Sequence, residues 1–209
     1  MVFSDKQIQI IKTAEQLFAA KGFDGTTVRD IADEAGVNLA MISYYFGSKE
    51  KLMEALFEQR TGNIKMRVES LLKDESLSPF QKIGLLVDEH IERMMHGKQF
   101  HRIMHCEQVI NKNPAVINLI KEWKKKNTAI ITQLIKDGQK KKAFKKKVDV
   151  VLLLSSMVGT INQMMINHEY YREINNLKNM PDNEFEELLK KNISVHIKNV
   201  FKTILINDA

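Results

Sequence analysis

The sequence predicts an all-α protein. Its 209 residues include only 9 Gly and 3 Pro, against 11 Met, and helices accommodate straight-chain residues far better than these two breakers. Apolar residues recur three or four positions apart along most of the chain, which is the period of an amphipathic helix. Apolar residues make up 44% and charged residues 28%. These proportions are typical of a globular chain and exclude wholesale disorder.

Caps and stops divide the first 50 positions into short helices, expected over 5–21, 28–35 and 39–45, with a fourth starting at Lys49. The residues that mark these ends are, in order, the capping pair Ser4 and Gln7, the stop Gly22, the pair Thr27 and Asp30, the stop Gly36, the cap Asn38, the stop Gly47 and the cap Ser48. Each cap supplies a side-chain oxygen to the unpaired N–H groups of a first turn.

The second and third helices are joined by a tight turn at Gly36 and Val37, which is the helix-turn-helix outline. The second helix of such a pair lies in a DNA major groove about 12 Å wide, so a miniature core must hold the pair at a fixed angle. We expect this core to contain Ile10, Leu17, Phe18, Ile31, Ala32, Val37, Ile42 and Phe46, supported by Leu52, Leu56 and Phe57.

The rest of the chain continues helix after helix, giving about nine in all. The fourth helix is expected to run to Leu72, and the others to cover about 79–96, 98–110, 114–138, 149–168 and 182–204. Helix 149–168 is apolar nearly all round in its first half, which predicts a central position. Helix 182–204 carries an apolar stripe from Phe185 to Ile204. Together the two helices predict a two-fold, four-helix dimer interface that includes Ile197.

The net charge of +6 is not in the N-terminal part. Residues 1–60 contain seven basic and nine acidic side chains, a charge of −2, whereas residues 121–150 contain eleven Lys and three acids, a charge of +8. The lysine triplets of 124–147 resemble a second nucleic-acid patch, but solvated helix ends are the favoured interpretation. A nucleic-acid role for the N-terminal part therefore depends on the placement of its residues.

Two linked motifs carry a family resemblance. The segment Thr26 to Val37, TTVRDIADEAGV, and the segment Tyr44 to Leu52, YYFGSKEKL, resemble in order and spacing the DNA-binding region of tetracycline-repressor-type (TetR family) transcription regulators. The preceding run from Ala14 to Phe23 also fits, so the resemblance covers about 50 residues. It implies an N-terminal DNA-binding unit and a larger C-terminal helical domain.

The resemblance also implies roles for single residues. The positions that would face DNA are Thr27, Arg29, Leu39, Ala40, Ser43, Tyr44, Tyr45 and Lys49. Arg29 would read a base, because a guanidinium can fork onto guanine O6 and N7. Lys49, at the start of the fourth helix, would meet a phosphate. Where the family usually has an aromatic residue this chain has Ser43, so thymine-methyl contact and DNA shape should contribute more to specificity.

About 150 residues follow the DNA-binding unit, more than dimerisation needs. We therefore expect a helix-turn-helix domain over 4–64, with the start of a linking helix, and an effector-binding and dimerisation domain over 65–209. Met and a few polar residues at positions expected to face inward suit an apolar cavity. The candidate ligand contacts are His101, Met104, His105, Trp123, Met157 and Asn162.

The sequence gives little support for a disulfide, a metal site, a catalytic motif or a membrane span. The single Cys106 excludes an internal disulfide, and His101 and His105 form at most half a metal site without a third ligand. We expect no metal and no cofactor, and no phosphate loop or nucleophile motif is present. The most apolar run, 150–158, is too short for a bilayer, so a cytoplasmic protein is expected.

The sequence thus predicts a homodimeric regulator that binds palindromic double-stranded DNA and is most simply a repressor released by a small-molecule effector. An activator, or a regulator without an effector, fits the same pattern. The alternative from another class is a helical enzyme or interaction module in which residues 1–50 are only a packing subdomain.

Overall fold

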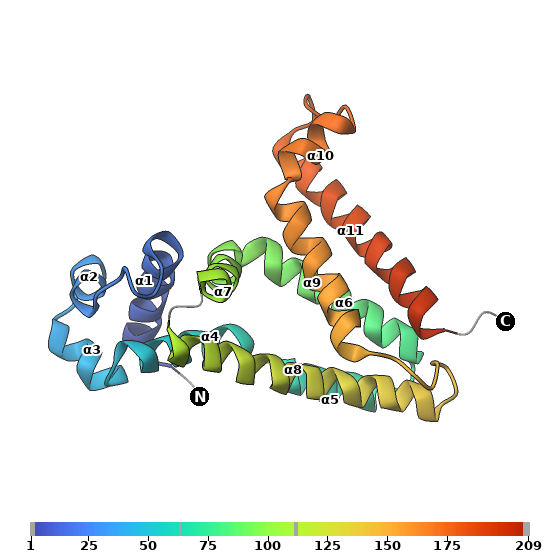
Figure 1. Cartoon of the computed structure of the whole chain (residues 1–209), viewed down its shortest axis with the longest axis horizontal. Helices are drawn as coiled ribbons and strands as arrows, with labels where there is room; N and C mark the ends of the chain where they lie inside the picture. Colours follow the sequence, from blue (N-terminus) through green and yellow to red (C-terminus); the bar gives the residue numbers. More distant parts are fainter. Residues whose placement is uncertain (1–2, 63, 111–112, 207–209) are drawn as a thin grey trace. The chain divides into compact units, whose positions relative to one another are not determined.

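The computed structural model describes residues 3–62, 64–110 and 113–206. Within these ranges the regular structure consists of eleven α-helices (Figure 1). They are α1 (Asp5–Lys21), α2 (Val28–Glu34), α3 (Leu39–Phe46), α4 (Lys49–Thr61), α5 (Ile64–Lys73), α6 (Pro79–His96), α7 (Lys98–Ile110), α8 (Pro114–Lys140), α9 (Val150–Ile166), α10 (His168–Ile174) and α11 (Asp182–Leu205). The all-α prediction is confirmed.

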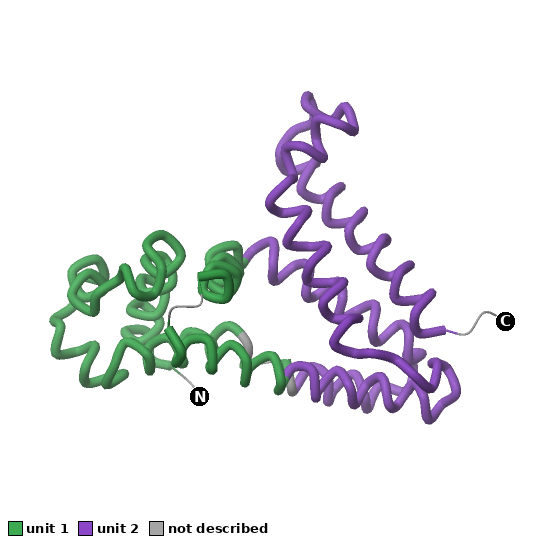
Figure 2. The backbone as a smooth tube through the Cα atoms, viewed as in Figure 1, with its two compact units in different colours: residues 1–65, 97–126 green, residues 66–96, 127–209 purple. Residues whose placement is uncertain are grey.

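The chain forms two compact units (Figure 2). Unit 1 contains residues 1–65 and 97–126, and unit 2 contains residues 66–96 and 127–209. The end of the first segment lies next to the boundary expected after residue 64. The expected domains and the compact units differ in the segment 97–126, because α7 and the first part of α8 pack in unit 1 beside α1 to α4.

The first four helices begin where their caps place them. Each cap accepts a hydrogen bond from a backbone N–H of the first turn: Ser4 from Gln7, Thr27 from Asp30, Asn38 from Ala40 and Ser48 from Lys51. The predicted capping boxes of α1 and α2 are both complete. A cap of this kind stabilises a helix by about 1 kcal/mol, so local sequence alone sets these helix starts.

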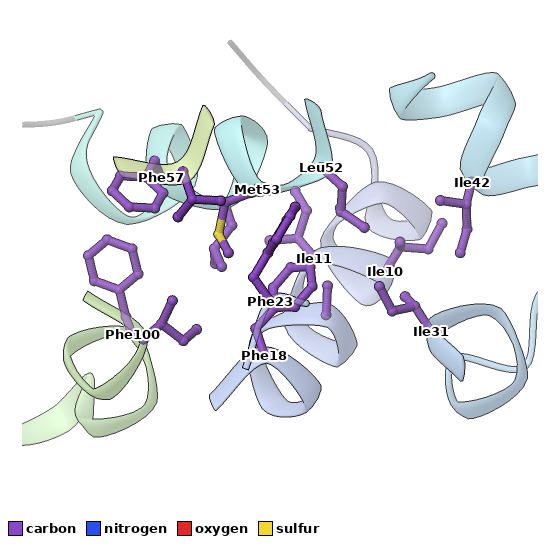
Figure 3. Packing of buried hydrophobic residues seen from close by; sticks show 14 of the residues in the cluster. Ile10, Ile11, Phe18, Phe23, Ile31, Ile42, Leu52, Met53, Phe57 and Phe100 are labelled. Atoms are coloured by element: carbon purple, nitrogen blue, oxygen red, sulfur yellow. The ribbon is translucent and has the colours of Figure 1, made fainter. Parts of the chain in front are cut away.

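All eleven predicted core residues belong to the hydrophobic core of unit 1 or pack against it, and Figure 3 shows part of this core. Of the eleven, Ile10, Phe18, Ile31, Ala32, Ile42, Leu52, Leu56 and Phe57 are buried, and Leu17, Val37 and Phe46 pack on them half-buried. The core also takes Ile11, Phe23 and Met53, and five residues from later in the chain: Phe100, Ile103, Met104, Val116 and Ile120. The helix-turn-helix is therefore supported from outside the first 60 residues.

Unit 2 is organised around α11, which packs on α6 and α9. Its buried residues recur every four positions: Phe185, Leu189, Ile193, Ile197, Phe201 and Leu205. The expectation that this stripe is available to a second subunit is wrong for its central part, since Ile197 is only 2% exposed within its own chain. The stripe fills the core of unit 2, while Val195 and Ile204 lie on the exposed part of the helix.

The sequence predicts a central position for α9, but the helix is buried on one side only. Leu153, Met157 and Ile161 form its one buried stripe, whereas Val151 is 60% and Leu152 65% exposed. Its apolar residues therefore serve two faces. One face contacts α6, α10 and α11, and the other is left exposed by the described part of the chain.

Two breaks raise the number of helices from nine to eleven. Gly62 ends α4, where a single longer helix to Leu72 was expected, and glycine is the weakest helix former after proline. A short α10 follows α9 at Asn167. Among the described residues no single helix is both long and apolar enough to cross a membrane, and only α9 and α10 together, bent by 75° at their junction, have the length and composition for it.

Candidate nucleic-acid interface

The turn between α2 and α3 fixes the angle of the helix pair. Gly36 has φ of 61°, a left-handed conformation that glycine adopts without the steric cost of a side chain. The N–H of Val37 donates to the carbonyl of Ala32 at 3.0 Å, closing α2 in the manner of a Schellman motif. From α1, the Gln9 amide donates to the Ala35 carbonyl at 2.8 Å. The turn is thus held by a bond to α2 and by a bond from α1.

Helix α3 presents a small exposed face. Ile42 is 1% exposed and anchors the helix in the core, while Leu39 is 40% and Tyr44 84% exposed. Ala40 and Ser43 are exposed beside them. These four lie on the side of α3 away from the core, as a reading helix requires.

The two aromatic residues that follow on α3 have different environments. Tyr45 is half-buried against the core of unit 1, and its ring meets the Tyr44 ring edge-on at 5.2 Å. Packing on the core holds Tyr45 more firmly than its neighbour Tyr44, which is 84% exposed. Both remain candidates for contacts to the DNA backbone.

Thr27 and Arg29 are exposed at the start of α2. The Thr27 hydroxyl accepts from the Asp30 N–H at 3.0 Å and donates to the Asp30 carboxylate at 2.7 Å. The backbone N–H of Thr27 and then its hydroxyl, both hydrogen-bonded to this carboxylate, lower the pKa of Asp30. The cap is therefore charged and closed at neutral pH, with Arg29 in its first turn.

Lys49 has an environment that the sequence does not reveal. Its ammonium donates to the Phe23 carbonyl at 2.8 Å and to the Thr26 carbonyl at 2.9 Å. It also lies 4.3 Å from the centre of the Phe23 ring. The side chain is half-buried, so two of the three N–H donors of this expected phosphate contact are already used inside the protein.

The six candidate ligand contacts are divided between the two units. Unit 1 contains His101, Met104, His105 and Trp123, and unit 2 contains Met157 and Asn162. Met104 and Met157 are buried, and His101, Trp123 and Asn162 are half-buried. His105 is exposed, so the inward orientation expected for it is wrong. It follows Met104 directly, and neighbouring helical residues point about 100° apart.

Trp123 belongs to an aromatic cluster of unit 1. Its ring lies edge-on to Phe57 at 6.2 Å and to Phe100 at 6.5 Å, and these two rings meet at 5.1 Å. The indole N–H is buried and has no hydrogen-bond partner among the described residues. An unsatisfied buried donor costs about 1–3 kcal/mol, so this is a place where a bound carbonyl or phosphate oxygen would gain a hydrogen bond.

Sequence reasoning missed two buried carboxylates in unit 1. Glu15 is 1% exposed and accepts from the Arg60 guanidinium at 3.0 Å. Glu107 is 4% exposed and accepts from the Phe23 N–H at 2.8 Å. Glu107 lies three and four residues after Met104 and Ile103, at the spacing of the buried face of α7. That spacing was the available signal for an inward-pointing acid.

Two lysines of the lysine-rich region make local contacts, and the described residues contain no metal-like cluster. Within the lysine-rich region, Lys141 pairs with Asp137 at 2.9 Å and Lys145 donates to the Thr203 carbonyl at 2.9 Å. In the residues that the structure describes, no three His, Cys, Asp or Glu side chains gather as metal ligands would.

The fold and the exposed face of α3 define a helix-turn-helix protein. Residues 10–56 match the family described as bacterial regulatory proteins, tetR family, and residues 57–200 match the family described as YsiA-like protein, C-terminal region. The chain belongs to the TetR family of transcription regulators. It is a DNA-binding regulator and not an enzyme, which removes the alternative of a helical enzyme.

Similar proteins match between 76% and 93% of the chain. The protein named Probable HTH-type transcriptional regulator YttP of Bacillus subtilis is 28% identical over 93% of each chain. The Fatty acid metabolism regulator protein of the same organism is 27% identical over 76% of this chain and 80% of its own. The crystal structure of the transcriptional regulator FadR from Bacillus subtilis in complex with stearoyl-CoA shares the fold, with a TM-score of 0.64 and 23% identity over 91% of this chain and 96% of its own.

Proposed function

We propose that this regulator is a homodimeric repressor that leaves a palindromic operator when it binds a largely apolar acyl ligand. The observation that carries the proposal is the exposed face of α3 on a buried anchor, next to the capped start of α2. The residues proposed to face DNA are Thr27, Arg29, Leu39, Ala40, Ser43, Tyr44 and Tyr45. Two copies of α3 would enter successive major grooves about 34–36 Å apart, and we propose that the protein acts in the cytoplasm, where such an operator would lie.

Exposed apolar residues of unit 2 support the dimer. On α9 and α10 these are Val151, Leu152, Ile166, Tyr170 and Ile174, and on α11 they are Val195 and Ile204. Soluble monomers seldom leave many large apolar side chains exposed together. A second copy of α9 and α10 would cover the exposed apolar residues of these two helices in a two-fold arrangement, with α9 supplying the small exposed residues Ser155, Ser156 and Gly159 for close approach.

Two observations support an acyl ligand. The cluster of Phe57, Phe100 and Trp123 offers apolar contact and one unused N–H donor, the combination by which pockets hold and orient apolar ligands. One similar protein is named a fatty acid metabolism regulator, and another was solved in complex with stearoyl-CoA. We propose that a long-chain acyl-CoA is the effector class, with the thioester oxygen accepting from the Trp123 indole.

The test is operator affinity with and without ligand. Fluorescence anisotropy against the DNA upstream of the gene should show tight binding, and stearoyl-CoA should weaken it by about 5- to 150-fold, the usual range of coupling between sites. Coenzyme A alone should have no effect. Trp123→Phe keeps the ring packing but removes the donor, so it should bind operator normally and respond less to stearoyl-CoA.

The two parts of the proposal fail separately. Tight operator binding that no acyl-CoA changes would remove the effector class and leave a DNA-binding regulator. An equal response in Trp123→Phe and wild type would remove the indole from the site. Binding to DNA without preference for any upstream sequence would contradict the operator itself.

A further inference from the structure

The turn between α1 and α2, residues 22–26, is held by helices from two distant parts of the chain. From α7, the Glu107 carboxylate accepts the Phe23 N–H at 2.8 Å. From α4, the Lys49 ammonium donates a hydrogen bond to the Phe23 carbonyl at 2.8 Å. Both polar groups of one peptide residue are thus engaged by oppositely charged side chains, and the Phe23 side chain between them is fully buried.

The hydrogen bond from the Phe23 N–H to Glu107 of α7 is stronger than a bond between neutral groups. Glu107 is 4% exposed, and a hydrogen bond to a charged acceptor contributes more than one between neutral groups. A buried carboxylate is costly to desolvate, so the bond to Phe23 matters to it as well. The neighbouring Asn113 amide donates to the Asp24 carboxylate at 3.3 Å. Residues of the C-terminal family region, 57–200, therefore hold the turn at two places.

The contact made by α4 closes the other side of the turn. The Lys49 ammonium also donates to the Thr26 carbonyl at 2.9 Å. The Thr26 hydroxyl donates in turn to the Gly22 carbonyl at 2.8 Å. The next residue is Thr27, the cap of α2. Fixing residues 22–26 therefore fixes where α2 begins. Helix α2 contains Arg29 and leads into the turn to α3.

We propose that Glu107 is a positioning residue for operator binding, and that with Lys49 it clamps the turn 22–26 so that the state of α7 sets the placement of α2 and α3. The proposal builds on operator binding under the proposed function and adds its control by α7. In this arrangement Lys49 acts inside the protein instead of neutralising a phosphate. Withdrawal of Glu107 from Phe23 leaves a buried carboxylate without its donor, so movement of α7 and release of the turn are energetically linked.

The first arm of the test compares Glu107→Ala with Glu107→Gln. The amide oxygen of Gln can still accept the Phe23 N–H, whereas Ala removes the acceptor. We expect Ala to weaken operator binding about tenfold and Gln to stay within about twofold of wild type. Glu15→Gln is the matched control, because it alters another buried carboxylate of unit 1 that does not contact the turn. It should lower the melting temperature and leave the turn protected.

The second arm measures hydrogen exchange of residues 22–34 by mass spectrometry without DNA. Glu107→Ala should lose protection in this segment well below its melting temperature, while Glu15→Gln should keep it. This readout stands even if no operator binds, so failure of the clamp and failure of the proposed function are distinguishable. Unchanged exchange and unchanged operator affinity in a folded Glu107→Ala protein would overturn the proposal.

The third arm is the salt dependence of operator binding. Each phosphate neutralised by a lysine contributes about 0.9 to the slope of log K against log salt. Lys49→Ala should weaken binding without changing this slope, as should Glu107→Ala. A slope reduced by about one unit in Lys49→Ala would show that Lys49 contacts a phosphate and would overturn its assignment to the clamp.

Discussion

Arg29 shows how a single exposed residue can be tested for base reading. It lies in the first turn of α2, exposed beside a closed cap. Arg29→Ala should weaken specific binding by about 1–3 kcal/mol and relax the preference at one base pair, because the guanidinium fork is lost. Arg29→Lys keeps the charge without the fork, so it should keep the salt slope and lose the preference. The measurement is anisotropy over operators changed one base pair at a time.

Equal preferences of Arg29→Ala and wild type at every base pair would assign Arg29 to solvent. The same titration also distinguishes base reading by Arg29 from readout of DNA shape. If specificity depends mainly on DNA shape, as the small face of Leu39, Ala40 and Ser43 favours, base changes outside the contacted positions will alter affinity.

Residues also show where sequence reasoning works and where it does not. Ser4, Thr27, Asn38 and Ser48 are caps that act on residues two or three positions away, and the sequence predicts all four. Glu107 acts on Phe23, 84 residues away, and no local pattern encodes that pairing. Its helical spacing with Met104 could have indicated the inner face of α7, but its partner depends on how α7 packs on α1.

At the scale of elements, the α2–α3 turn depends on one glycine. Gly36 has φ of 61°, and a Cβ added there would meet no other atom within 4 Å. Gly36→Ala should therefore destabilise the protein by about 1 kcal/mol through backbone strain alone. Gly36→Asn should cost less, since asparagine tolerates this conformation. Urea denaturation measures both, and equal stability of Gly36→Ala and wild type would contradict the argument.

Helix boundaries followed local signals closely. The expected 5–21 is α1, and 98–110 is α7. The sequence missed the break at Gly62, because the apolar period continues through it, and it missed the short α10, which lies where no helix was expected between 168 and 182. A glycine within a continuing period is an ambiguous stop, and packing decides whether the helix bends or ends there.

At the scale of the whole molecule, the dimer face can be separated from the core. Leu152→Glu changes an exposed residue of α9. If that face is the interface, the substitution should weaken dimerisation by about 3 kcal/mol, roughly 150-fold, and weaken operator binding with it. Sedimentation velocity at micromolar concentration should show monomers with an unchanged helical spectrum.

Two substitutions are the controls for this prediction. Ile197→Glu places a charge in the core of unit 2 and should unfold it, because Ile197 is 2% exposed. Val109→Glu changes an apolar residue of α7 that is 70% exposed in unit 1, and it should remain dimeric. A dimeric Leu152→Glu protein would place the interface elsewhere.

The sequence by itself determined the helices, their caps, the helix-turn-helix core and the family, because these depend on residues close together in the chain. The tertiary structure alone decided which of several apolar faces is buried. Two apolar sides of α9 look equivalent in sequence, yet only the side with Leu153, Met157 and Ile161 is fully buried in the described part of the chain, while Val151 and Leu152 stay exposed. It also decided that Glu107 and Lys49 bond to the N–H and the carbonyl of Phe23. Pairings of this kind follow from the way distant helices pack, and neither periodicity nor capping specifies them.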